Sequence, residues 1–178
     1  MPPVVRKRRP LIDHRFADER SQPFVDLIGL VRTDRPILRA VDLGCGSGLL
    51  ALAALRLGAS RAAAVDIDPL AVRATGDNAA LNGLPLPVTQ GSAEALAGLQ
   101  GTSADLLLCN ILAPVIEALA PSFEQILSPS GQGLLSGLLV DQVPSLQQTL
   151  TGCGWQAELI GRQEPWGLMR IRRARVVT

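Results

Sequence analysis

Short apolar runs alternate with segments of helical periodicity along most of this sequence. The runs are bounded by turn residues, which is typical of buried strands. The expected strands are 37–43, 62–65, a short one near Val88, 105–109 and one that begins at 133–136. Because helical segments separate them, we expect right-handed crossovers and a mostly parallel, doubly wound α/β sheet, with a ligand site at the carboxyl ends of its strands.

The helices between these runs have recognisable ends. Asp68 is a good N-cap before Pro69 in the first helical position, and this helix should end at Asn82-Gly83. Ser47 is expected to open a helix over 49–57 that Gly58 closes. Further helices are expected from Ser21, over about 144–150, and after Pro114 with a buried face of Val115, Leu119, Phe123 and Leu127.

The C-terminal part alternates as strands instead. Segments 155–160 and 168–176 are expected to pair as an antiparallel hairpin around Pro165 and Gly167. Basic residues cluster in the second segment, and we interpret them as a solvated edge strand. They are Arg170, Arg172, Arg173 and Arg175.

The chemistry is expected at the turn Gly44-Cys45-Gly46-Ser47-Gly48, between the first strand and its helix. Missing side chains let a ligand approach the backbone there, and a helix N-terminus presents free N–H groups. Gly44, Gly46 and Gly48 are therefore candidate cofactor contacts, and Asp42 is expected near the cofactor's amino-acid end. A nicotinamide site is disfavoured because Leu49 stands where G-x-G-x-x-G needs a small residue.

Polar residues follow the next strands as well. Asp66 stands where a carboxylate can accept hydrogen bonds from both hydroxyls of a ribose, and Ile67 beside it is a further cofactor-binding candidate. Ser92 or the Ala93 N–H could contact an adenine edge, although Ser92 could equally cap a helix. Asn110 ends the fourth strand, where its amide can orient a substrate amine; the alternative is an N-cap ahead of Pro114.

Composition narrows the function classes. With 178 residues, 47% of them hydrophobic, the chain can bury one core, and we expect a polar basic tail over 1–20 and one domain over 21–178. Three widely spaced cysteines suggest core thiols and no metal site. The single histidine, His14, permits no hydrolase triad. Without a membrane-length apolar run or signal peptide, a cytoplasmic protein with no membrane contact is expected.

Four segments resemble the class I methyltransferases, and most closely the bacterial ribosomal protein L11 methyltransferases: Val41–Gly48, Ala64–Ala71, Asn78–Gly83 and Asn110–Ala113. The resemblance implies a seven-stranded Rossmann-like sheet, S-adenosylmethionine as cofactor and N-methylation of amino groups on a protein substrate of the ribosomal type. It places Gly44 and Gly46 at the donor, Asp66 at the ribose and Asn110 as the catalytic residue on the acceptor side. Asn110 is expected among the cofactor-binding residues as well.

The resemblance leaves the acceptor open. The family carries a separate N-terminal recognition domain, whereas fewer than forty residues precede Ile37 here, so a partner subunit could supply substrate recognition. The alternatives are an RNA or small-molecule methyltransferase and a non-catalytic cofactor-binding domain. A nucleic-acid partner is supported by the basic run Arg6–Arg9 and the C-terminal arginines. The absence of an Asn-Pro-Pro-aromatic motif at Asn110 argues against it.

Overall fold

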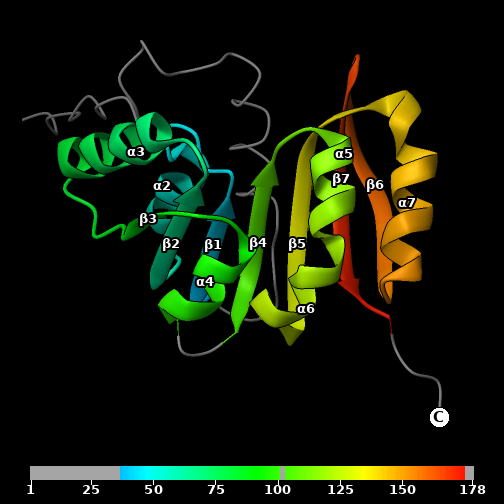
Figure 1. The fold of residues 1–178 in the computed structure, drawn as a ribbon, viewed down its shortest axis with the longest axis horizontal. Coiled ribbons are helices and arrows are strands. Elements are labelled where there is room, and N and C mark those ends of the chain that lie inside the picture. Colours follow the sequence, from blue (N-terminus) through cyan, green and yellow to red (C-terminus); the bar gives the residue numbers. More distant parts are fainter. Residues whose placement is uncertain (1–36, 101–102, 175–178) are drawn as a thin grey trace, which may run out of the picture.

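The computed structural model describes residues 37–100 and 103–174, and for 97–100 it describes the backbone alone. These residues form one seven-stranded sheet in the order β3-β2-β1-β4-β5-β7-β6 (Figure 1). Strands β1 to β5 pair in parallel, and β7 is antiparallel to both of its neighbours. The strands are β1 (Arg39–Leu43), β2 (Arg61–Asp66), β3 (Val88–Gln90), β4 (Ala104–Asn110), β5 (Leu127–Leu139), β6 (Trp155–Gln163) and β7 (Trp166–Arg173).

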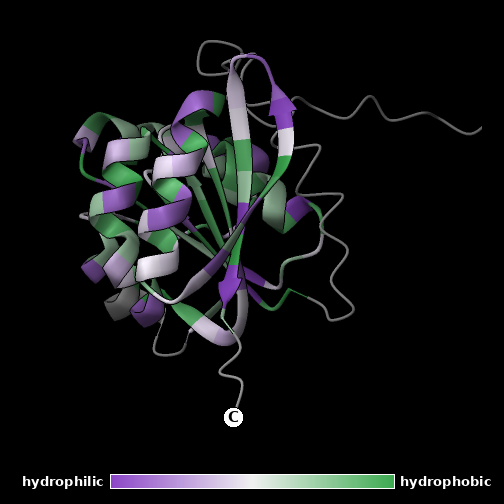
Figure 2. Ribbon diagram, turned by 90° about the vertical axis from the view of Figure 1, so that its right-hand side faces the viewer, coloured by the Kyte–Doolittle hydropathy of each residue, from purple (hydrophilic) through white to green (hydrophobic). Residues whose placement is uncertain are grey.

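Helices cover both faces of the sheet. They are α2 (Leu49–Arg56), α3 (Pro69–Asn82), α4 (Ala93–Gln100), α5 (Ala113–Leu119), α6 (Phe123–Ile126) and α7 (Val143–Gly152), with short 3-10 turns η2 (Ala120–Ser122) and η3 (Val140–Gln142). One core packs the sheet against α4 to α7, and the other packs it against α2 and α3. In Figure 2 the central strands are coloured mostly as hydrophobic, whereas the helices mix hydrophobic and hydrophilic positions. The expected doubly wound α/β class and seven-stranded sheet are confirmed.

The side chains of β1 point alternately into the two cores. Val41 and Leu43 point into the core under α4 to α7, and Ala40 points into the core against α2. The same alternation in β4 sends Leu107 and Cys109 to one side and the neighbouring leucines to the other. Successive side chains of a strand point to opposite faces, so a strand buried on both faces is apolar throughout. Asp42 is the exception in β1, and it is fully buried.

The ends of α3 agree with the sequence, whereas the start of α2 does not. Asp68 caps α3 by accepting a hydrogen bond from the Leu70 N–H at 2.8 Å, and Gly83 ends the helix in the left-handed region. The expected role of Ser47 as a cap is wrong. The N-cap of α2 is Gly48, with φ 77°, and it has no side chain that could cap the helix.

The single helix expected after Pro114 is wrong in two respects. The segment is divided into α5, η2 and α6, and Pro121 stands inside the 3-10 turn, where its missing N–H cannot continue an α-helix. Val115 is 44% exposed, and Ile116 takes the buried position instead. Strand β5 also begins earlier than expected, at Leu127. Its register against β4 shifts after Ala104, which hides the start of the strand from a periodicity analysis.

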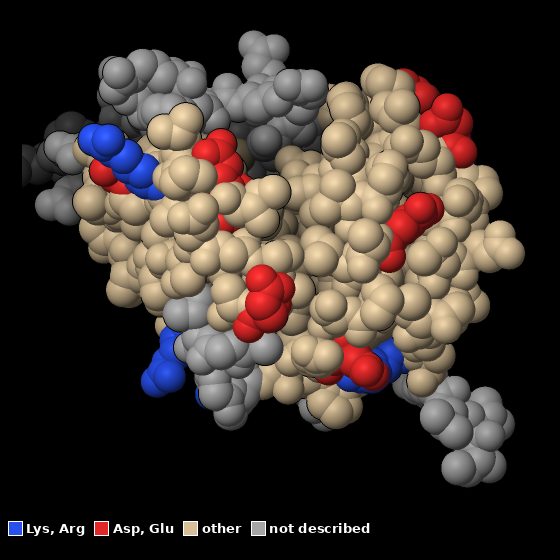
Figure 3. All heavy atoms as spheres, in the orientation of Figure 1, with Lys and Arg blue, Asp and Glu red and all other residues tan. Residues whose placement is uncertain are grey.

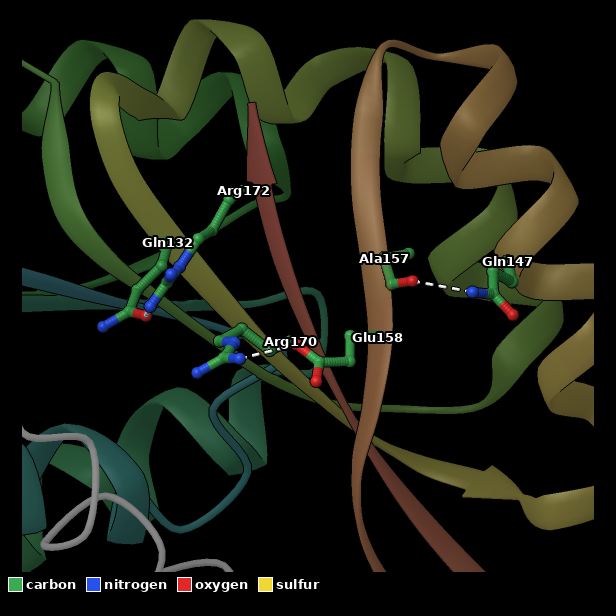
Figure 4. Close-up of polar contacts among 6 residues, drawn as sticks. All are labelled: Gln132, Gln147, Ala157, Glu158, Arg170 and Arg172. Atoms are coloured by element: carbon green, nitrogen blue, oxygen red, sulfur yellow. Dashed lines mark hydrogen bonds and ion pairs between the residues drawn. The ribbon is translucent and has the colours of Figure 1, made fainter. Parts of the chain in front are cut away.

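The C-terminal hairpin is confirmed, but its arginines do not lie on an edge strand. β7 lies between β5 and β6, so β6 is the edge. Arg170 forms an ion pair of 2.6 Å with Glu158 of β6, and Arg172 donates to the Gln132 side chain of β5 (Figure 4). Cross-strand pairing therefore engages these side chains. Arg173 points to the opposite face of the sheet, where its guanidinium lies 5.2 Å from the Trp155 ring centroid.

Several expected features lie outside the described residues. These are the helix from Ser21, the basic run over 6–9, His14 and Arg175. Among the helices that the structure describes, none has the length and apolar character required to cross a membrane.

Candidate functional site

The turn between β1 and α2 contains three glycines in the left-handed region, with φ 72° at Gly44, 55° at Gly46 and 77° at Gly48. Other residues adopt this conformation only with strain. The outer two glycines are also needed for packing. A Cβ at Gly44 would overlap the Ile111 side chain, and one at Gly48 would lie 2.7 Å from Thr75 Cγ2. A Cβ at Gly46 would meet nothing within 4 Å, so the centre of the turn faces open space.

The carboxyl end of β2 holds this turn in place. The N–H groups of Gly44 and Cys45 both donate to the Val65 carbonyl at 3.0 Å. The Gly46 N–H donates to Asp66 Oδ2 at 2.9 Å. These three N–H groups therefore stabilise the turn itself. Asp66 therefore stabilises the turn through a hydrogen bond, in addition to lying next to it.

An open cavity of about 400 Å³ lies against this turn, within the size range of small-molecule sites. Three of the expected site residues line it: Gly44, Gly46 and Asn110. The rest of its lining comes from the turn, from the first turn of α2, and from the N-cap and first two turns of α3. These residues are Cys45, Ser47, Leu49, Leu50, Asp68, Leu70, Ala71 and Ala74.

A second group of expected residues lies next to the cavity, at the carboxyl ends of β2 and β3. The Gly91 N–H donates to the Asp66 carbonyl at 3.0 Å, which brings the turn before Ser92 beside Asp66. Ile67 is 75% exposed, and its carbonyl accepts from the Gln90 side chain. Ser92 is half-buried and Ala93 is buried. None of Asp66, Ile67, Ser92 and Ala93 belongs to the cavity lining itself.

Asp42 lies beneath the turn and not in the cavity. Its side chain is fully buried, and Oδ2 accepts a hydrogen bond from the Ala51 N–H of α2 at 3.1 Å. Its other oxygen has no hydrogen-bond partner among the described residues. Burial raises the pKa of Asp42 from 3.8 to about 7, the charge of Asp66 adds to this, and the Ala51 N–H opposes it. The structure therefore places Asp42 under the turn, and its expected contact with the cofactor's amino-acid end stays a prediction.

Asn110 is the last residue of β4, and it is half-buried at the cavity. The alternative that it caps α5 is wrong, because Leu112 is the N-cap of that helix. The next residue, Ile111, is held from two sides. Its side chain lies against Gly44, and a Cβ on Gly137 would lie 2.5 Å from the Ile111 carbonyl oxygen. The loop that carries Asn110 therefore packs closely against Gly137 of β5 and Gly44 of the glycine turn.

Sequence analysis missed the contribution of α3. Leu70, Ala71 and Ala74 line the cavity, and the buried side chains of Thr75 and Asn78 bond to the turn. Spacings of three and four place these residues on one face of a helix. Small and polar residues on a helix face that should carry large apolar ones were the available signal.

The cysteines show no reactive character. Cys45 and Cys109 are buried, and Cys153 packs half-buried against a core. Burial, with the charge of Asp42 adding to it, raises the pKa of Cys45 to about 12 and raises that of Cys109 as well. Within 37–100 and 103–174, no group of three or more His, Cys, Asp or Glu side chains could hold a metal ion.

Comparison with known proteins agrees with this geometry. Residues 26–174 match the family model described as ribosomal protein L11 methyltransferase (PrmA). A protein named ribosomal protein L11 methyltransferase from Parasynechococcus marenigrum (strain WH8102) is 62% identical over 136 residues, which cover 74% of this chain and 47% of that protein. A protein of the same name from Synechococcus sp. (strain RCC307) is 55% identical over 139 residues, which cover 76% of this chain and 46% of that protein. The chain thus spans about half the length of these relatives.

Solved structures show the same architecture. The crystal structure of the ribosomal protein L11 methylase from Lactobacillus delbrueckii subsp. bulgaricus superposes with a TM-score of 0.83 at 29% identity, covering 98% of this chain and 91% of that one. A precorrin-6y C5,15-methyltransferase from Geobacter metallireducens has a TM-score of 0.70 at 18% identity, with 93% and 99% covered, and shows the fold alone. The enzymes of this family depend on S-adenosylmethionine, so S-adenosylmethionine is the cofactor of the family. The chain belongs to the ribosomal protein L11 methyltransferase family.

Proposed function

We propose that this chain is an S-adenosylmethionine-dependent methyltransferase domain that methylates amino groups of ribosomal protein L11. The observation that carries the proposal is the combination at Gly46. This glycine has φ 55°, its Cβ direction is open, its N–H is fixed by Asp66, and it lines a cavity with Asn110 at its edge. The family match over 26–174 and the names of the relatives supply the reaction and the substrate.

The residues present fit the cofactor. The unfilled space beside Gly46 is where a ligand can approach the backbone, and the cavity is large enough for one. Asp66 would hold the ribose: each of its oxygens accepts one backbone N–H, from Gly46 and from Asp68, and each retains capacity to accept a hydroxyl. The exposed side chain of Ile67 offers an apolar surface for the adenine ring, beside Ser92 and Ala93.

Methyl transfer can proceed without a catalytic acid-base pair if the reacting groups are held in position. The bound cofactor supplies an activated methyl group, so alignment of an unprotonated amine with it provides most of the acceleration. Asn110 would orient that amine, since its amide offers both a donor and an acceptor at the cavity. The loop fixed by Gly44 and Gly137 keeps this amide in one place.

The charge of the chain gives no general support to a nucleic-acid acceptor. The full sequence has 17 Lys and Arg against 16 Asp and Glu, a formal net charge of +1, whereas a protein that binds nucleic acid through its phosphates needs a marked positive excess. On the face of the described residues shown in Figure 3, carboxylates outnumber cations. A basic protein would be attracted to this face, whereas a phosphate backbone would be repelled from it. Recognition of the substrate would come partly from a partner subunit, and action on a ribosomal protein would place the enzyme in the cytoplasm.

Transfer of a labelled methyl group tests the proposal. The purified chain is incubated with tritiated S-adenosylmethionine and either ribosomal protein L11, L11 with acetylated amines, or ribosomal RNA. We expect label in L11 alone, and a higher rate with a cell extract if a partner supplies recognition. Labelling of acetylated L11 or of RNA would overturn the acceptor assignment. No labelling of L11 by a chain that binds the cofactor, with or without extract, would overturn the proposed activity.

A further inference from the structure

Two polar side chains inside α3 are almost fully buried. Thr75 is 0% exposed and Asn78 is 1% exposed. Burying a hydroxyl or an amide is costly unless each finds a hydrogen-bond partner. The two residues lie three positions apart and therefore share one face of α3. Their partners identify what this face does.

Both side chains bond to carbonyl groups of the cofactor turn. Thr75 Oγ1 donates to the Gly46 carbonyl at 3.0 Å, and Asn78 Nδ2 donates to the Ser47 carbonyl at 2.8 Å. Thr75 Oγ1 also lies 3.3 Å from Cys45 Sγ. Two consecutive carbonyl groups of the turn, those of Gly46 and Ser47, therefore point toward α3.

Holding these carbonyls sets the direction of the peptide planes. In a trans peptide, the C=O and the next N–H point in opposite directions. Fixing the Gly46 carbonyl on Thr75 turns the Ser47 N–H away from α3. The Gly46 N–H is already fixed by Asp66 from the other side. The peptide groups on both sides of Gly46 are thus held, one from β2 and one from α3.

The packing at Gly48 shows that this contact is close. A Cβ there would lie 2.7 Å from Thr75 Cγ2 and 3.0 Å from Thr75 Oγ1, so only glycine allows α3 to approach the turn this far. Neither Thr75 nor Asn78 lines the cavity. Their effect on a ligand would pass through the backbone of the turn.

We propose that Thr75 and Asn78 are positioning residues for the methyl donor: they hold the Gly46 and Ser47 peptides in the orientation that binds S-adenosylmethionine. This inference rests on the proposed function, because it assumes that the turn binds that cofactor. It assigns to α3 a part in donor affinity beyond its part in the core.

The test compares Kd for S-adenosylhomocysteine by calorimetry. Thr75→Val keeps the shape and removes the hydroxyl, Thr75→Ser restores a hydroxyl, and Asp77→Ala changes an exposed residue of the same helix. We expect about a tenfold weaker Kd for Thr75→Val, recovery to near the wild-type value for Thr75→Ser, and no change for Asp77→Ala. Asn78→Asp replaces the donor with an acceptor opposite the Ser47 carbonyl and should weaken binding at least as much.

Melting temperatures without ligand separate positioning from stability. A purely structural role would lower them and leave the Kd of the folded fraction unchanged. Equal Kd values for the wild type, folded Thr75→Val and Asn78→Asp would overturn the inference and leave the proposed function standing. If Thr75→Val does not fold, Asn78→Asp decides alone, because Thr75→Ser is expected to bind like the wild type. Failure of the wild type to bind S-adenosylhomocysteine would instead refute the proposed function.

Discussion

The Gly46 N–H donates a hydrogen bond of 2.9 Å to the Asp66 carboxylate, which joins the centre of the glycine turn to the end of β2. The second Asp66 oxygen accepts the Asp68 N–H at 3.0 Å. One carboxylate therefore fixes the turn and the entrance to α3, and it stands where a ribose is expected. Loss of this group should affect both turn order and cofactor binding.

Asp66→Ala is expected to weaken S-adenosylhomocysteine binding by about 1.5–3 kcal/mol, because hydrogen bonds to a charged partner are lost and the Gly46 N–H is left unpaired. Calorimetry on the variant measures this. Asp141→Ala, which removes an exposed carboxylate in η3, serves as the control and should bind as the wild type does. An unchanged affinity for Asp66→Ala would show that Asp66 does not hold the cofactor.

Gly46→Ala and Gly83→Ala form a matched pair. Both glycines are left-handed, with φ 55° and 62°, and a Cβ on either would meet nothing within 4 Å. Each variant should lose about 1 kcal/mol of folding free energy through backbone strain. Only Gly46 lines the cavity. We expect S-adenosylhomocysteine affinity to fall by about tenfold or more for Gly46→Ala alone, and equal affinities would place the donor elsewhere.

Asn110→Ala should separate donor binding from methyl transfer. The residue lies at the cavity edge and is proposed to orient the acceptor amine. We expect Kd for S-adenosylhomocysteine to stay within about twofold, while the transfer rate to L11 falls by about a hundredfold, since misplacement of a reactant has costs of this order. A normal transfer rate would remove Asn110 from the acceptor side, and a large loss of donor affinity would assign it to the cofactor.

Asp42 gives a pH dependence of stability with a definite sign. Its pKa rises from 3.8 to about 7 on folding, so between these values the folded state binds more protons than the unfolded state. Its contribution is complete below about pH 4 and is lost as the pH rises through 7. From about pH 5 to about pH 8, the stability of the wild type relative to Asp42→Asn should fall by roughly 2–3 kcal/mol in urea unfolding. A pH-independent difference would contradict the burial of a titrating Asp42.

Much of the fold follows from local signals in the sequence. The bounds of α3 were predictable because Asp68-Pro69 and Gly83 act within a single turn of chain. The glycine turn and Asn110 were found because their positions after strands suffice to place them at the carboxyl edge. Local chemistry specifies these features without knowledge of what packs against them.

Features that depend on distant partners were not predictable. The row of arginines on β7 looks like an exposed edge until the strand order places β6 outside it. Ser47 is a good cap by residue type, yet the left-handed Gly48 takes that position because the turn must pass close to Thr75. The burial of Asp42 and the bonds from Thr75 and Asn78 likewise arise only when α2 and α3 pack beneath the turn.

Calorimetry of the purified chain with S-adenosylmethionine, S-adenosylhomocysteine and NAD, in parallel, tests the central claim most directly. The turn around Gly46 is expected to bind the first two with micromolar Kd and to reject NAD, because Leu49 occupies the position where a dinucleotide needs a small residue. Binding of neither sulfur cofactor, or binding of NAD in their place, would contradict the assignment of this cavity to a methyl donor.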